Sequence, residues 1–277
     1  MNTVSHAPEI FLILRASLGF KNKICFQIFC MIKRAGRNQP KSAVEGLKLD
    51  MALKSVDDQY KGCKSKMAHL VKTKYLMKEI NNSAQFKTGW QVGEMFVKFP
   101  NGYLKRSHLI AIYVYSDNNV YQQFNPDNRS GKKQYKHKTY KWYSLYFLLT
   151  EAIQILKKTQ YGCRLTYRGT SVEFNKYVLN KEVRFGSFAS SSLDRNIAQG
   201  FGSKSCFEIY TCEGADVSEY SKYPHEREVL IPPYEKFKVT AVRTRKYQPY
   251  LWCDTVFTLK STGTRSDLNC ALLFPLQ

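Results

Sequence analysis

The chain of 277 residues is poor in acidic residues and in histidine. It has 22 aspartates and glutamates against 43 lysines and arginines, and only five histidines. Its eight cysteines include no Cys-x-x-Cys pair, and this pattern argues against a zinc site. No Gly-x-Gly-x-x-Gly motif occurs, which excludes the glycine-rich phosphate loop of the dinucleotide-binding fold. We therefore expect neither a metal ion nor a doubly wound sheet.

Long apolar segments are absent as well. No segment has the ~18 uninterrupted apolar residues of a transmembrane helix, and residues 271–277 lack the long apolar tail of a lipid-anchor signal. Near the N-terminus, Arg15 interrupts the apolar run Ile10–Leu14, so this region makes a poor secretory leader. We expect residues 1–45 to be an atypical leader or a disordered segment. Either this leader functions or the protein is not exported. The C-terminal sequence predicts release of the protein rather than anchoring to a membrane.

The excess of basic residues gives a formal net charge of +21, which raises nucleic acid as a partner. The densest basic stretch, Gly131–Trp142, interleaves lysines with aromatic residues. No helix-turn-helix, zinc finger or RNA-binding sheet motif accompanies it. We therefore predict a solvated basic loop and no nucleic-acid partner. A role in attracting an anionic substrate or an acidic protein surface is the alternative.

Hydrophobic residues make up 43% of the chain, enough for one sizeable domain. Apolar residues at helical spacing predict helices between residues 55 and 115 and a strong helix at Trp142–Leu156. After Tyr161 the pattern changes to short alternating strands, expected at Arg164–Arg168, Val183–Ala189, Phe207–Thr211, Glu228–Ile231, Lys236–Val242 and Asp254–Leu259. Helices followed by strands indicate an α+β fold.

Two segments of the strand region carry candidate binding groups. Arg168 ends an alternating run and precedes Gly169, which allows backbone or a ligand to come close. An arginine in that position suits a bidentate grip on a phosphate. Further along, three serines at positions 190–192 precede a helix-like stretch that Gly200 ends. A serine before a helix is most often its N-cap, which accounts for Ser192 and leaves the other two unassigned.

A third segment places Glu226 and Glu228 directly before the apolar run 229–231. In an extended chain, side chains two positions apart share a face, so we expect both carboxylates to point into the same space. Paired carboxylates perform acid/base chemistry beside a developing cation. A Glu-Arg-Glu sequence on a strand edge is usually solvated, so the pair alone does not identify a site.

Together, Arg168, the Ser-x-Ser that begins at Ser190 and the Glu-x-Glu of Glu226 and Glu228 resemble the signature of the arginine-specific ecto-mono-ADP-ribosyltransferases. Other segments read like family sequence in the family order: Leu49-Asp50-Met51-Ala52, Asp57-Asp58-Gln59-Tyr60-Lys61-Gly62-Cys63, Gln123-Phe124-Asn125, Glu228-Val229-Leu230-Ile231-Pro232-Pro233-Tyr234 and Asn269-Cys270-Ala271. The resemblance implies that residues 46–277 form a mono-ADP-ribosyltransferase catalytic domain with a split β-sheet core. Such enzymes transfer ADP-ribose from NAD to arginine side chains of target proteins and release nicotinamide.

The resemblance also implies catalytic roles. Arg168 would clamp the pyrophosphate of NAD, and Ser190 would hold the carboxylate of Glu228. Glu228 would bind a ribose hydroxyl and offset the charge of the oxocarbenium ion left when nicotinamide departs. Glu226 would orient the acceptor guanidinium, which is always protonated near neutrality, and accept its proton.

Three further residues match family positions near the substrates. Ser221 and Tyr121 would contact NAD, and Tyr223 would stack on the incoming guanidinium. For both tyrosines an ordinary core or surface position is the alternative.

NAD hydrolysis, with water as the main acceptor, is the alternative activity. A binding module without activity is disfavoured because no signature residue is missing, and we expect a monomer.

The resemblance implies two disulfides, Cys63–Cys270 and Cys163–Cys212. Cys206 and Cys253 are additional and could form a third bridge, but the sequence does not decide their pairing. Disulfides form in oxidising compartments. We therefore expect an extracellular or secretory location, with the protein secreted rather than lipid-anchored.

Overall fold

The computed structural model describes residues 46–97, 100 and 102–274, which belong to one compact unit. The leader or disordered segment expected at residues 1–45 lies outside the described residues. Within the described part of the chain, no helix is long and apolar enough to cross a membrane.

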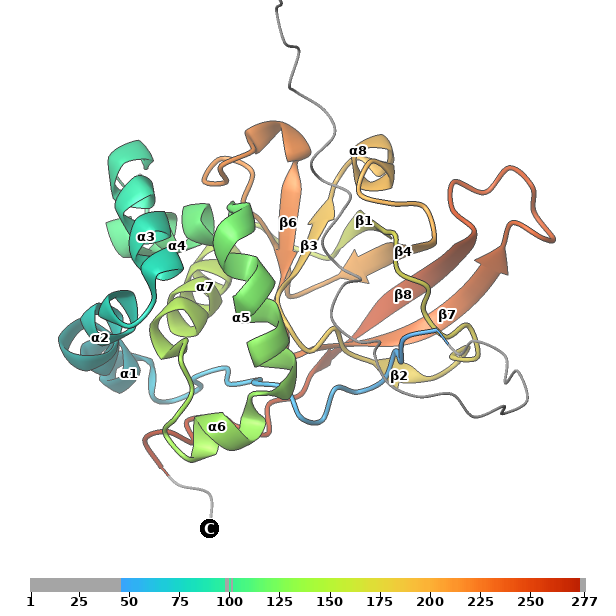
Figure 1. The fold of residues 1–277 in the computed structure, drawn as a ribbon. Helices are drawn as coiled ribbons and strands as arrows, with labels where there is room; N and C mark the ends of the chain where they lie inside the picture. Colours follow the sequence, from blue (N-terminus) through green and yellow to red (C-terminus); the bar gives the residue numbers. More distant parts are fainter. Residues whose placement is uncertain (1–45, 98–99, 101, 275–277) are drawn as a thin grey trace, which may run out of the picture. The chain divides into compact units, whose positions relative to one another are not determined.

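Helices form the first half of this unit (Figure 1). The strongly apolar helix predicted at residues 142–156 is confirmed: it begins one residue later, and 11 of its 14 residues are buried. The helical elements are α1 (Lys64–Leu70), the π-helix η1 (Val71–Tyr75), α2 (Leu76–Asn81), α3 (Ala84–Phe96), α4 (Arg106–Ser116), α5 (Asn118–Ser130), α6 (Lys132–Lys136) and α7 (Tyr143–Leu156).

The second half forms one eight-stranded sheet in the order β2-β7-β8-β4-β1-β3-β6-β5. Neighbouring strands are antiparallel except β4 and β8, which are parallel. The strands are β1 (Arg164–Thr170), β2 (Glu182–Val183), β3 (Ala189–Ser192), β4 (Ser205–Thr211), β5 (Ala215–Asp216), β6 (Glu228–Ile231), β7 (Glu235–Thr244) and β8 (Thr255–Thr264), with helix α8 (Arg195–Gln199) after β3. The predicted α+β class is confirmed.

The sheet has a separate apolar core on each side. Leu230 of β6 and Phe188, just before β3, pack with the helices in the larger cluster. Phe207 of β4 and Phe257 of β8 belong to a second cluster, and their rings stack with centroids 5.1 Å apart. Burial of both faces explains why residues 229–231 of β6, whose four residues are all buried, form a continuous apolar run rather than an alternating pattern.

The single strand predicted at Val183–Ala189 is wrong. Strand β2 ends at Val183, and β3 begins at Ala189 elsewhere in the same sheet. Between them the chain turns at Gly186, whose φ of +69° lies in the left-handed region that favours glycine. The sequence pattern therefore spans two short strands and the turn that separates them.

The solvated loop predicted at Gly131–Trp142 is also wrong. Residues 132–136 form α6, and the aromatic side chains of Tyr135, Tyr140 and Trp142 are buried. The hydroxyl of Tyr135 donates a hydrogen bond to the Asp58 carboxylate at 2.8 Å. The aromatic residues of this stretch therefore contribute to the core, while most of its lysines are exposed.

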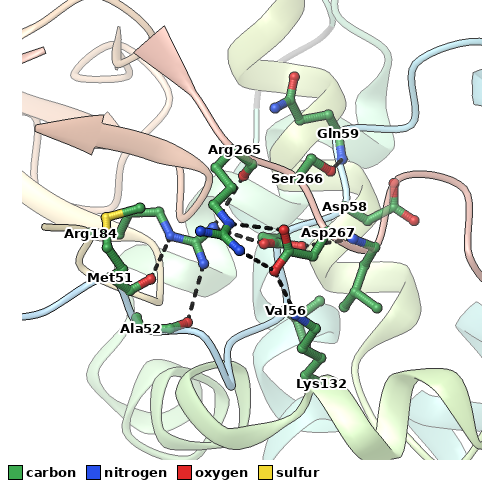
Figure 2. Close-up of polar contacts among 12 residues, drawn as sticks. Met51, Ala52, Val56, Asp58, Gln59, Lys132, Arg184, Arg265, Ser266 and Asp267 are labelled. Carbon is green, nitrogen blue, oxygen red and sulfur yellow. Dashed lines mark hydrogen bonds and ion pairs between the residues drawn. The ribbon is translucent and has the colours of Figure 1, made fainter. Parts of the chain in front are cut away.

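A buried arginine joins the two ends of the unit to the sheet (Figure 2). The guanidinium of Arg184 forms an ion pair with Asp57 at 2.8 Å, and both side chains are fully buried. It also donates hydrogen bonds to the carbonyls of Met51 (2.7 Å), Ala52 (3.2 Å) and Arg265 (3.1 Å). One charge thus holds together three segments that are far apart in the sequence. We call this group the Arg184 clasp.

Three disulfides cross-link the described part of the chain, and one of them lies beside Asp58, the neighbour of the clasp residue Asp57. The structure forms Cys63–Cys270 and Cys163–Cys212, the two bridges that the resemblance implies, with Cα atoms 6.1 and 4.1 Å apart. It also pairs Cys206 with Cys253, which links β4 to the chain just before β8. Beside the first bridge, the Asp58 carboxylate accepts a hydrogen bond from the backbone N–H of Cys270 at 3.0 Å.

The clasp gives a stability prediction. Replacing Arg184 with methionine keeps much of the side-chain volume but leaves the Asp57 carboxylate buried without its cation. Breaking a buried ion pair from one side costs about 3–5 kcal/mol. We expect a loss of this size in the free energy of unfolding of Arg184→Met, measured by urea denaturation with the disulfides intact.

Arg265→Met is the matched control. The Arg265 side chain is 42% exposed and pairs with Asp267 at 2.9 Å. Exposed pairs contribute about 1 kcal/mol or less, so this variant should lose little stability. Equal losses in the two variants would mean that the buried pair has no special role.

Candidate active site

Three of the predicted catalytic residues lie on three neighbouring strands. Arg168 is in β1, Ser190 is in β3 and Glu228 is the first residue of β6. Strand β3 lies between the other two and pairs antiparallel with both. The sheet therefore brings together side chains that are up to 60 positions apart, from Arg168 to Glu228.

Arg168 is a half-buried cation at this point of the sheet. Its guanidinium donates a hydrogen bond to the backbone carbonyl of Ser190 at 2.5 Å. Burial lowers the pKa of Arg168, and the nearby side chains of Tyr115, Tyr121 and Glu228 counter that shift. Arginine is in effect always protonated in proteins.

Gly169 allows the backbone of the next helix to lie directly against β1. A Cβ atom at this position would come within 2.2 Å of the Ala198 carbonyl oxygen and 2.4 Å of the Gly202 carbonyl oxygen. The close approach expected after Arg168 is thus made by the protein's own backbone. Any larger residue would displace α8 and the turn that follows it.

The three serines of β3 connect it to the carboxylate segment. The Ser190 side chain hydrogen-bonds the Glu228 carboxylate, and the Ser191 hydroxyl donates to the Val229 carbonyl at 2.9 Å. Ser192 donates to the carbonyl of Glu226 at 2.7 Å. These bonds fix the backbone that presents both glutamates.

The N-cap predicted at Ser192 is therefore wrong. Helix α8 begins after Asp194, whose carboxylate accepts a hydrogen bond from the backbone N–H of Asn196 at 2.8 Å. Aspartate is as good an N-cap as serine. The Ser192 hydroxyl instead donates to the Glu226 carbonyl and accepts the backbone N–H of Asp194 at 3.0 Å.

Glu228 is a buried carboxylate, with only 5% of its surface exposed. Burial raises its pKa above the ordinary value of 4.5, and the charge of Glu226 adds to this rise. Hydrogen bonds from Ser190 and Ser221 and the charge of Arg168 oppose it. The Ser221 hydroxyl donates to Oε2 of Glu228 at 3.3 Å. The site thus holds a carboxylate in a poorly solvated place and supports its charge with two hydroxyls and an arginine.

Glu226 does not share an extended strand with Glu228, so that expectation is wrong. Residues Pro224–Glu226 form the 3₁₀-helix η2, and Arg227 follows in the left-handed region with a φ of +49°. The carbonyl of Pro224 accepts the backbone N–H of Arg227 at 3.1 Å, which closes this turn. Glu226 is half-buried, whereas Glu228 is buried. The two carboxylates still act on each other, since the charge of Glu226 raises the Glu228 pKa.

The structure adds Tyr115 and Arg129, which the sequence reasoning missed. The Tyr115 hydroxyl donates to the Phe188 carbonyl at 2.9 Å and also hydrogen-bonds the Ser190 side chain. Its burial raises its pKa to about 12. The Arg129 guanidinium lies near enough to Arg168 for the two charges to interact. Neither residue has a sequence signal, because each occupies an ordinary position on a helix.

The proposed substrate contacts lie around these groups. Tyr121 of α5 is half-buried, and its ring centroid is 6.4 Å from that of Tyr115. Tyr223 is half-buried just before η2, and the amine of Lys222 lies 5.7 Å from its ring centroid. The roles of Tyr121, Tyr223 and Ser221 toward a substrate stay predictions.

Comparison with known proteins identifies the family. A family model described as NAD:arginine ADP-ribosyltransferase matches residues 49–255. The chain belongs to this family. It is 37% identical over 237 residues to the chicken (Gallus gallus) NAD(P)(+)--arginine ADP-ribosyltransferase 2, a match that covers 82% of this chain and 73% of the relative. It is 33% identical over 269 residues to the bovine (Bos taurus) ecto-ADP-ribosyltransferase 5, with 90% and 82% coverage.

Solved structures agree with this family membership. The crystal structure of the eukaryotic mono-ADP-ribosyltransferase ART2.2 superposes with a TM-score of 0.68 at 32% identity, over 82% of this chain and 99% of that one. A mutant of ART2.2 has also been crystallised in complex with NAD, and it matches with a TM-score of 0.67 at 30% identity and the same coverage. The predicted ADP-ribosyltransferase fold is thus confirmed.

The surroundings of Glu228 predict how pH affects this transferase. A hydrogen bond to an ionised carboxylate lowers its pKa, so removing one raises it. We expect kcat/KM for NAD to fall on the acid side with an apparent pKa above 4.5, the ordinary value for glutamate. Ser221→Ala should raise the apparent pKa of this fall, the acid limb of the pH profile, still further.

Ser191→Ala is the control, because the Ser191 hydroxyl binds a backbone carbonyl and not the carboxylate. Its acid limb should match that of the wild type. If Ser221→Ala leaves the acid limb unmoved, the Ser221 hydroxyl does not support the Glu228 charge.

Proposed function

We propose that the protein transfers ADP-ribose from NAD to arginine side chains of target proteins and releases nicotinamide. The observation that carries this proposal is the meeting of Arg168, Ser190 and Glu228 on three adjacent strands, with Glu226 in the adjoining turn. Family membership supports the same reaction. NAD is the co-substrate, a role supported by the NAD complex of the related ART2.2 mutant.

The reaction requires a group that stabilises a transient cation. Nicotinamide leaves as a neutral molecule, and the ribose it leaves behind carries the positive charge of an oxocarbenium ion. Glu228 is suited to meet that charge because its carboxylate is buried and poorly screened by water. The side chains of Ser190 and Ser221 form hydrogen bonds with this carboxylate. Their hydrogen bonds favour the ionised form, which is the form the reaction needs.

Arg168 would bind the pyrophosphate of NAD. Its planar guanidinium can offer two parallel N–H groups to phosphate oxygens. Among the described residues it donates a hydrogen bond only to the Ser190 carbonyl, which leaves donors for the substrate. Arg129 supplies a second positive charge nearby. The pyrophosphate would thus be fixed on β1 while the ribose reaches Glu228 on β6.

Glu226 would serve the acceptor. A protonated guanidinium is a poor nucleophile and must lose a proton as its nitrogen attacks the ribose carbon. Glu226 lies next to Glu228 but is more exposed, on a turn and not in the sheet. This position suits contact with a side chain that arrives from another protein. Tyr223, just before that turn, would stack on the same guanidinium.

Residues 46–277 would be the catalytic domain, and its three disulfides support an oxidising compartment. We propose an extracellular location. Relatives include the mouse (Mus musculus) GPI-linked NAD(P)(+)--arginine ADP-ribosyltransferase 1, which is 34% identical over 240 residues and matches 80% of this chain and 72% of its own length. Secretion rather than lipid anchoring stays a prediction, as does the monomeric state.

The two carboxylates should be separable by mutation. Glu226→Gln removes the proton acceptor for the guanidinium but leaves the groups that cleave NAD. We expect transfer to the arginine analogue agmatine to fall at least about 100-fold, while NAD hydrolysis persists because water can lose its proton to solvent. The measurement is the ratio of ADP-ribosyl-agmatine to free ADP-ribose in one reaction.

Glu228→Ala is the comparison variant, and it should abolish both products because it removes the group that meets the cation. Two results would contradict the division of roles. One is a proportional loss of both products in Glu226→Gln, and the other is more than a tenth of wild-type turnover in Glu228→Ala. A wild type that yields only free ADP-ribose in the presence of agmatine would favour NAD hydrolysis as the main activity.

A further inference from the structure

A cavity lies in the helical half of the unit, and the reaction proposed above does not use it. Its volume is about 470 Å³, and its walls come from α2, the start of α3, α5 and the segment around Lys138–Tyr143. Small-molecule sites typically have about 300–1,000 Å³. The cavity is therefore large enough for a ligand of moderate size.

The inner wall of the cavity is aromatic. Tyr75, Tyr140, Trp142 and Tyr143 line it, and each is at most 8% exposed. Three of these side chains have their polar atoms bound within the protein: the Trp142 indole N–H donates to Asp127, the Tyr143 hydroxyl to the Tyr135 carbonyl and the Tyr140 hydroxyl to the Asn128 side-chain carbonyl. These four aromatic side chains give the cavity a partly apolar wall, which favours a flat apolar group in the ligand.

The rim of the cavity is positively charged. Lys78 from α2 and the exposed Lys138 and Lys141 from the basic stretch line it together. None of the three forms an ion pair within the described part of the chain. Part of the excess positive charge of the sequence thus lies at the mouth of a cavity.

Two carboxylates also line the cavity, and each already has a partner. Glu79 caps the start of α7 by accepting the backbone N–H groups of Tyr143 and Ser144, each at 2.9 Å. Burial raises the pKa of Glu79 to about 8, and its hydrogen bonds from Tyr143 and Ser144 oppose that rise. Asp127 accepts the indole N–H of Trp142 at 2.7 Å. The three lysines therefore outnumber the two carboxylates, both of which already accept hydrogen bonds from the protein.

The start of α3 adds hydrogen-bond donors. Ser83, Ala84 and Gln85 line the cavity, and they are the N-cap and the first two residues of this 13-residue helix. The Ser83 hydroxyl accepts the backbone N–H of Phe86, whereas helical geometry gives the N–H groups of Ala84 and Gln85 no intrahelical acceptor. Such groups bind anions well. They reinforce the three lysines on the same cavity.

Helix α5 separates this cavity from the candidate active site. Gln123 and Asp127 line the cavity. Asn125 and Arg129, by contrast, contact Tyr115 and Ser187 on the active-site side. Residues two positions apart on an α-helix point about 200° apart. The two pairs therefore lie on opposite faces of α5, and a ligand in the cavity would not occupy the NAD position.

We propose that this cavity is a second ligand site, which binds a small organic anion that combines a flat ring with a phosphate, the class of the nucleoside monophosphates. The phosphate would lie between Lys78, Lys138 and Lys141 near the start of α3. The ring would lie against the aromatic wall, and the side-chain amides of Asn82 and Gln123 would be available for its polar edge. This site is independent of the reaction proposed above.

Calorimetric titration with AMP tests the proposal, with excess carba-NAD, an unreactive NAD analogue, filling the active site. We expect AMP to bind one site on the full-length protein, more tightly than either adenosine or inorganic phosphate alone. The double variant K138E/K141E should weaken AMP binding at least tenfold, because it reverses two of the three rim charges.

K133E/K136E is the matched control. It changes the net charge equally on the same basic stretch, but neither residue lines the cavity. It should retain AMP affinity within about threefold, with agmatine modification unchanged in both double variants as evidence of folding. Three results would overturn the proposal: no AMP binding to the wild type, displacement of AMP by carba-NAD, or equal weakening in the two double variants.

Discussion

The Arg184 clasp is the constraint on which the catalytic half of the structure depends. Its guanidinium cannot leave the core without exposing the Asp57 carboxylate to an apolar surrounding, so the position of residue 184 is fixed. The chain then turns at Gly186 and enters β3 only a few residues later. Ser190 is therefore placed by a charge pair outside the active site, and the rest of the catalytic group follows from the pairing of β3 with its neighbours.

A second dependence runs from β3 to the two glutamates. Its three consecutive serines bind the Glu228 carboxylate, the Val229 carbonyl and the Glu226 carbonyl. These bonds hold one glutamate inside the sheet and the other on an adjoining turn. Two glutamates only two positions apart therefore differ in exposure to water: Glu226 is half-buried and Glu228 is buried. This contrast is what the proposed roles require, because one carboxylate would lie beside a cation in a poorly solvated site and the other beside an incoming side chain.

The sequence predicted the parts of the fold that depend on local patterns. The apolar periodicity of α7 and the unbroken apolar run of β6 each marked one element closely. The single strand predicted at Val183–Ala189 was wrong because its residues belong to two strands, β2 and β3. The buried Arg184–Asp57 pair and the turn at Gly186 lie between these strands. The Glu-x-Glu spacing correctly indicated proximity, but the 3₁₀ turn that produces it depends on a hydroxyl from another strand. Tyr115 and Arg129 could not be identified, since their importance arises only from tertiary contacts.

The bridge between Cys63 and Cys270 has a mechanical consequence. It spans 207 positions of sequence and lies close to both ends of the described unit. A pulling force applied to the chain before Cys63 and after Cys270 would pass through this covalent bond. The segment between them, with every proposed catalytic residue, lies off the covalent path of that force. Stretching of the polypeptide from its ends would therefore act first on residues 46–62, which contain the Arg184 partners Met51, Ala52 and Asp57, while the covalent loop stays closed.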